Sequence, residues 1–144
     1  MAALTSERNT IQLRGDSRVA PLAAAVKVWK GGILMRNAAG FVTKGAVAAG
    51  CIGIGRTEAT VDNSAGTAGA ASVAYRPGIF GFANSGATEA VTQAEIGKLC
   101  YIADDQTVAK TSGAATRSPA GIVDGIEDGT VWVRLDEAVT RGAM

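Results

Sequence analysis

Histidine is absent from this chain of 144 residues. Its absence removes the commonest general base, the commonest transition-metal ligand, and every Ser-His or Cys-His nucleophile pair. The only two cysteines, Cys51 and Cys100, lie far apart in apolar runs and form no C-x-x-C motif. The sequence therefore offers neither a zinc knuckle nor a redox motif. We expect two buried thiols, and a single disulfide remains open as the alternative.

Aromatic residues are few, and neither sign of charge is in clear excess. Aromatics make up 5% of the chain, while glycine contributes 19 residues and much of the 47% hydrophobic content is alanine. Small side chains bury little area each, so the core must be thin or completed by neighbouring subunits. The 14 basic residues nearly balance the 13 acidic ones. This balance favours neither nucleic acid nor a membrane as partner, and no apolar run is long enough to span a bilayer.

What the chain does contain is a series of short runs of β-branched and small residues. They begin after Leu22 and are separated by glycine at the spacing typical of an all-β sandwich or barrel. No run keeps a helical apolar period for three turns. We therefore predict a small β-barrel or sandwich of short antiparallel strands with at most one or two short helical turns. The predicted strands lie within residues 24–29, 32–36, 40–45, 51–57, 71–77, 79–83, 98–103, 107–111, 120–126 and 130–135.

Three connections can be predicted from local chemistry. Thr92 and Glu95 have the spacing of a capping box, which indicates one helical turn closed by Gly97. Asp128-Gly129 is a dipeptide preferred by type I′ hairpin turns, because both central residues need positive φ. The segment 61–71 is rich in Gly, Ala, Ser and Thr and has no apolar anchor, so we expect a long loop there.

Two segments superficially suggest chemistry. The glycine run 50–56 lacks the G-x-G-x-x-G spacing of a dinucleotide site, and we expect a strand packed closely against another backbone. Asp104 and Asp105 form no D-x-D-x-D-G calcium loop, and adjacent residues on a strand point to opposite faces. We predict that this pair is the corner of a hairpin. An enzyme that uses the pair with a divalent metal is the least favoured alternative.

The first twenty residues are polar and charged, and they lead into Pro21. We interpret 1–20 as an N-terminal arm and 21–144 as a β-rich domain with a short C-terminal tail. Within the arm Ile11, Leu13 and Val19 alternate enough to add a strand to another chain, although a frayed terminus is the competing interpretation. Trp29 and Trp132 are the largest anchors, for the core or a subunit interface. Our candidate interface residues are Ile11, Leu13, Arg14, Val19 and Trp29.

Three blocks of the sequence, residues 26–45, 52–85 and 91–135, resemble the small capsid decoration, or cement, proteins encoded among the head genes of tailed bacteriophages. The most specific parts are "VDNSAG" (61–66), "GIFGFANS" (78–85) and "YIADDQTVAKT" (101–111). The resemblance implies a β-rich subunit, commonly a homotrimer, that binds the outside of the expanded head and bridges neighbouring major capsid proteins. It implies no enzymatic activity and no cofactor.

The expected location is accordingly the outer capsid surface of a virion, after synthesis in the cytoplasm of the host bacterium. A carbohydrate- or receptor-binding module and an enzyme are the two alternative functions. A small β-sandwich module that binds a carbohydrate or receptor, on a tail or fibre, would display several exposed aromatics, because sugar rings stack on flat faces. The seven aromatics here lie mostly inside strand patterns, which disfavours that alternative. An enzyme is the third.

Overall fold

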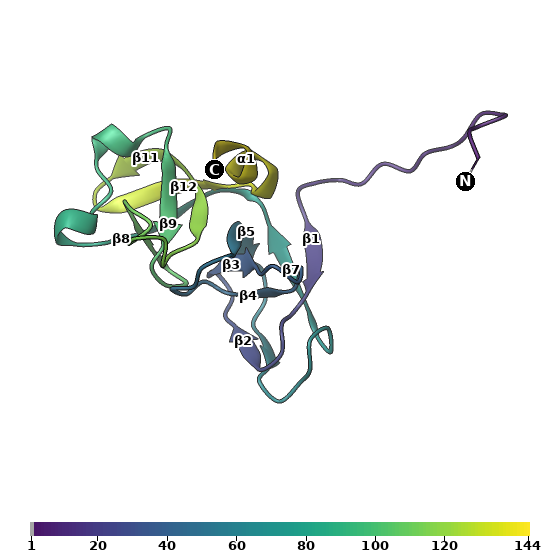
Figure 1. Ribbon diagram of the computed structural model, residues 1–144, viewed down its shortest axis with the longest axis horizontal. Helices are drawn as coiled ribbons and strands as arrows, with labels where there is room; N and C mark the ends of the chain where they lie inside the picture. Colours follow the sequence, from purple (N-terminus) through teal and green to yellow (C-terminus); the bar gives the residue numbers. More distant parts are fainter. Residues whose placement is uncertain (1) are drawn as a thin grey trace.

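The computed structural model describes residues 2–144 and consists mainly of short β-strands (Figure 1). The predicted all-β fold is confirmed. The strands are β1 (Arg18–Pro21), β2 (Val26–Val28), β3 (Ile33–Arg36), β4 (Val42–Lys44), β5 (Ile52–Thr57), β6 (Val61–Asn63), β7 (Ser72–Arg76), β8 (Gly78–Asn84), β9 (Leu99–Ile102), β10 (Thr107–Ala109), β11 (Pro119–Glu127) and β12 (Thr130–Leu135). The helical elements are the 3₁₀ turns η1 (Ala87–Glu89) and η2 (Gln93–Glu95) and the helix α1 (Glu137–Ala143).

The strands form two units that follow one another along the chain. The first contains a five-stranded sheet in the order β1-β7-β5-β3-β4, with the two-stranded ribbon β2-β6 beside it. The second is a closed barrel in the order β10-β8-β12-β11-β9. Only Pro77 separates the last strand of the first unit from the first strand of the barrel. In Figure 1 the barrel lies at the left and the N-terminal sheet at the centre and right.

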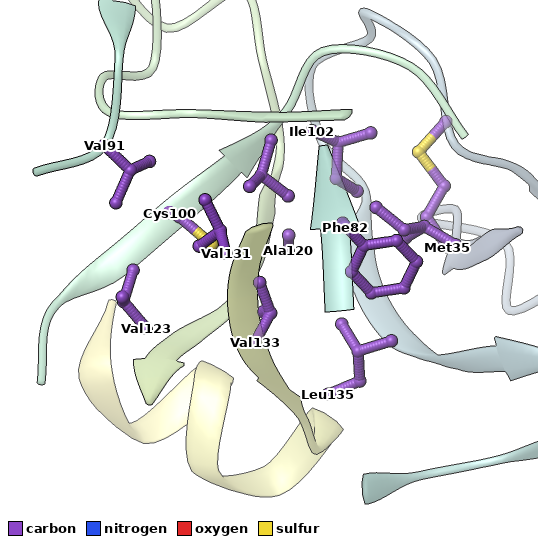
Figure 2. Packing of buried hydrophobic residues seen from close by; sticks show 12 residues of the cluster. Met35, Phe82, Val91, Cys100, Ile102, Ala120, Val123, Val131, Val133 and Leu135 are labelled. Atoms are coloured by element: carbon purple, nitrogen blue, oxygen red, sulfur yellow. The ribbon is translucent and has the colours of Figure 1, made fainter. Parts of the chain in front are cut away.

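Strand β3 joins the cores of the two units because it is buried on both faces. Ile33 and Met35 contribute to the barrel core, whereas Leu34, which points the other way, contributes to the core of the N-terminal sheet. Figure 2 shows the barrel core, where Phe82 and Met35 lie close together and valines fill the other end. The two units therefore share one strand and form one continuous body.

The glycine run is a point of close backbone contact, as predicted. A side chain at Gly53 would collide with the carbonyl oxygen of Ala120 in β11, and one at Gly55 would lie 2.8 Å from the carbonyl oxygen of Arg76 in β7. Only glycine lets β5 approach both the barrel and its own neighbour this closely. This explains why a strand at the centre of the molecule carries so little apolar side chain.

The predicted hairpins and turn are confirmed. Strands β9 and β10 pair antiparallel, and so do β11 and β12. Asp128 and Gly129 both have positive φ, at 49° and 79°, as a type I′ turn requires. The capping box at η2 is complete, with the Thr92 amide donating to the Glu95 carboxylate at 2.6 Å.

Three elements were not predicted. β1 begins at Arg18, inside the segment 1–20 assigned to the arm. β6 occupies the first residues of the segment 61–71, which we expected to be a loop, and pairs with β2. The segment following β12, expected to be a tail, is the helix α1. Its N-cap is Asp136, whose carboxylate accepts the Val139 amide at 3.1 Å.

Candidate interaction surface

Residues 2–17 form an exposed arm with neither strand nor helix, and the arm extends away from the body in Figure 1. Its large apolar side chains are uncovered: Leu4 is 72% exposed, Ile11 89% and Leu13 76%. Large apolar groups that are this exposed are costly in water unless a partner covers them. The arm therefore has the character of a segment that binds another surface.

The five candidate interface residues are all exposed, but they do not form one patch. Leu13 and Val19 line a shared cleft of about 480 Å³ at the base of the arm. Ile11 and Arg14 belong to the arm itself. Trp29 follows β2 and lines a different, smaller pocket of about 210 Å³. The ammonium of Lys27 lies 4.1 Å from the centroid of the Trp29 ring. The structure thus groups the arm with β1 and separates Trp29 from them.

Strand β1 has one open stretch of edge. The Leu22 amide donates to Ala71, next to β7, at 2.9 Å, and the Ala23 amide donates to Val42 in β4 at 2.8 Å. Because backbone groups alternate in direction along a strand, the backbone groups of Val19 and of residue 21 point away from β7. Position 21 is proline, which has no N–H. The outward backbone at Val19, continuous with the arm, is therefore the place where another strand can add.

A second cleft, of about 540 Å³, lies between the base of the arm and α1. Its walls include Arg18, Tyr75 and Glu137. The Glu137 carboxylate accepts the Arg36 Nε at 3.1 and 3.2 Å and the Arg141 guanidinium at 2.9 Å, so α1 is tied to β3. Sequence reasoning missed this helix. The signals were present in the Asp136 cap and in the spacing of four residues between Glu137 and Arg141.

Asp104 and Asp105 form the predicted corner. The Asp104 carboxylate accepts the Gln106 amide at 2.8 Å, and the Asp105 carbonyl accepts the Ile33 amide at 2.7 Å. The corner thereby fastens the β9–β10 hairpin to β3, and Gly45, which follows β4, leaves room for the backbone of Asp104 and Asp105. Within residues 2–144 no cluster of three or more Cys, Asp or Glu side chains is arranged to hold a metal ion.

The cysteines are free thiols in the structure, so the disulfide alternative is not seen. Cys100 is fully buried, and burial raises the pKa of its thiol to about 12. Cys51 is half-buried rather than buried as expected. Burial raises the pKa of its thiol, and a hydrogen bond with Ser118 offsets part of this rise. Neither thiol is appreciably ionised at neutral pH, so neither has the thiolate character of a reactive cysteine.

In two of the motifs that carry the resemblance, an asparagine side chain forms hydrogen bonds to the backbone of a loop. The buried Asn63 side chain of "VDNSAG" donates to the carbonyls of Ala23 and Thr67 at 2.9 and 3.1 Å. In "GIFGFANS" the Asn84 amide both accepts from and donates to the backbone of Val91, at 2.8 and 2.9 Å. In both motifs the asparagine therefore holds a loop against the body of the fold.

Both tryptophans lie on the surface. Trp29 is 52% exposed and Trp132 is 38% exposed, so the interpretation of either as a core anchor is wrong. Among the described residues, no helix has the length and apolarity needed to cross a membrane. No protein-family model matches the chain, and no curated protein or solved structure matches it.

Proposed function

We propose that this chain is a structural protein of a tailed-bacteriophage virion that decorates and stabilises the expanded capsid by bridging neighbouring major capsid proteins. In this proposal it acts as a homotrimer on the outer capsid surface, carries no enzymatic activity or cofactor, and is made in the cytoplasm of the host bacterium. Its partners are the major capsid protein and further copies of itself, with no role for nucleic acid or membrane. The proposal starts from the resemblance of the three sequence blocks.

One structural observation carries the proposal: an uncovered arm continues directly into the open edge of β1 on a rigid β body. A segment of 16 residues spans about 50 Å when extended, at roughly 3.3 Å per residue. It therefore reaches well beyond the body that holds it. Ile11 and Leu13 would enter apolar pockets of the capsid protein while the arm backbone pairs with a strand edge.

The rigid body supports the same role. Closure of the barrel removes its strand edges, so the barrel offers no edge to a partner strand and the arm is the segment left for attachment. In a homotrimer three arms would act together, and modest binding by each would become strong through multivalency. A near-neutral chain suits attachment to other protein surfaces.

The test mixes purified protein with undecorated expanded heads and measures binding by co-sedimentation and head stability by differential scanning calorimetry. We expect saturable binding and a higher melting temperature of the heads. Analytical ultracentrifugation of the free protein gives the oligomeric state. If the protein neither binds the heads nor changes their melting temperature, the proposed function is wrong.

A matched pair of variants tests the arm. Ile11→Asp combined with Leu13→Asp places two charges on the apolar face of the arm, whereas Thr10→Asp combined with Gln12→Asp places the same charges on the opposite face. We expect the first variant to lose head binding by tenfold or more, about 1.4 kcal/mol, and the second to lose much less. Equal losses would show that the arm does not bind as a strand with two distinct faces.

A further inference from the structure

Trp132 lies on the outer face of the barrel between two glycines. In the strand register it stands opposite Gly81 of β8 on one side and Gly125 of β11 on the other. A β-carbon at Gly81 would lie 3.4 and 3.5 Å from two atoms of the indole ring, so the ring leans across that glycine. A β-carbon at Gly125 would meet nothing within 4 Å. The indole ring thus lies over the backbone of Gly81 on one side and has open space over Gly125 on the other.

Two charged residues neighbour Trp132 in the strand register. Arg134 is two residues along β12, exposed on the same face. Asp124 is the extra residue of the bulge between Val123 and Gly125, and it is exposed too. The four salt bridges found in residues 2–144 all join other residues. Among these residues, Arg134 and Asp124 therefore have no ionic partner.

We propose that Trp132, Arg134 and Asp124 form a binding site for a neutral pyranose ring of a surface glycan. The axial C–H groups of the sugar would stack on the exposed indole face, since such groups prefer a flat aromatic surface with negative charge density. Arg134 would donate hydrogen bonds to sugar hydroxyls, and Asp124 would accept them. The open space above Gly125 would accommodate the pyranose ring.

The charges favour a neutral sugar over other occupants. One cation and one anion at the site suit hydroxyl groups, which both donate and accept, and they leave no net charge to attract an ionic ligand. A protein interface core is depleted in unpaired charge, which disfavours a second subunit as the occupant. The inference does not rest on the proposed capsid role, because the site lies on the barrel and the purified protein is sufficient to test it.

The experiment is saturation-transfer difference NMR of the full chain with methyl pyranosides of glucose, galactose, mannose and N-acetylglucosamine as probes. For at least one probe we expect saturation of the axial protons of one ring face. Trp132→Ala should abolish the signal. Gly125→Val should also abolish it, because valine fills the open space while the tryptophan is retained and φ at this position is not positive. Arg134→Gln and Asp124→Asn should each weaken binding about tenfold.

Trp29→Ala is the matched control, because Trp29 is also exposed but Lys27 lies over its ring. This variant should bind the same probe as well as the unmodified protein. Circular dichroism melting checks that each variant is folded. The proposal is overturned if no pyranoside gives a signal with the unmodified protein, or if Gly125→Val binds normally. It is equally overturned if Trp132→Ala changes the oligomeric mass, since the indole would then belong to a subunit interface.

Discussion

Replacing Thr140 by valine should stabilise this protein. Thr140 lies in α1 with 0% exposure, and within residues 2–144 its Oγ1 has no hydrogen-bond partner. A buried hydroxyl without a partner costs about 1–3 kcal/mol. Valine has nearly the same shape and a similar helix propensity, so little else changes. We expect the free energy of unfolding to rise by about 1 kcal/mol or more, and the melting temperature by roughly 3 °C per kcal/mol for a chain of this size.

Urea unfolding followed by circular dichroism measures this change, and Thr57→Val is the matched control. Thr57 is equally buried, at 1% exposure, but its hydroxyl donates to the Gly32 carbonyl at 3.2 Å. The same substitution there should lower stability by about 1 kcal/mol, because it removes a hydrogen bond that is made. The two variants should therefore shift the urea midpoint in opposite directions. If Thr140→Val also destabilises, the Thr140 hydroxyl has a partner in solution and the reasoning fails.

Three further outcomes are expected. Gly53→Ala should prevent correct folding, because the alanine side chain would collide with the barrel backbone. Soluble yield and near-ultraviolet circular dichroism measure this. As a control, Gly142→Ala in α1 should be tolerated or should raise the free energy of unfolding by about 0.5–1 kcal/mol. With iodoacetamide and mass spectrometry, Cys51 of the native protein should be labelled slowly, because burial raises the pKa of its half-buried thiol, and Cys100 only after unfolding; equal labelling rates would contradict the burial pattern. The Thr111 hydroxyl, by hydrogen bonding, lowers the pKa of Glu89 below its ordinary 4.5. The ionised Glu89 carboxylate therefore stabilises the fold above about pH 4.5, and this stabilisation is lost as the pH falls. Glu89→Gln should accordingly reduce the difference in urea midpoint between pH 7 and pH 3.

Strand positions could be predicted because alternation is a local property of the sequence. In β9, Cys100 and Ile102 are buried while Leu99 and Tyr101 are half-buried, as the alternation predicts. Turn chemistry is local as well, so Asp128-Gly129 and the capping box at Thr92 were identified correctly. These signals need no knowledge of what the strand packs against.

The missed elements depend on contacts that are distant in the sequence. β6 is a short strand in a stretch rich in small residues, and it exists because it pairs with β2 and because Asn63 binds the backbone of Ala23 and Thr67. α1 is too short for periodicity to reveal it, and its attachment depends on Arg36, which lies in another strand. Tertiary contacts decide such elements, and a single sequence does not show them.

The candidate interface was predicted in part. Polarity and alternation indicated an arm, and the exposure of Ile11 and Leu13 is consistent with one that binds a partner. Val19 was a candidate for strand addition, but its place in β1 of the N-terminal sheet was not predicted. That place depends on where β7 pairs with residues 18–21 and β4 with Leu22, and pairing register is not visible in one sequence.

The two tryptophans show why neighbours in space matter more than residue type. Trp29 and Trp132 both follow short β-branched runs, so the sequence gives them the same interpretation. Their neighbours separate them: the Lys27 ammonium lies over one ring, and the other stands between Gly81 and Gly125 in the register. The arm belongs to the N-terminal sheet and the Trp132 site to the barrel, so each can be altered alone. Head binding should survive the loss of the indole, and sugar binding should survive the loss of the arm.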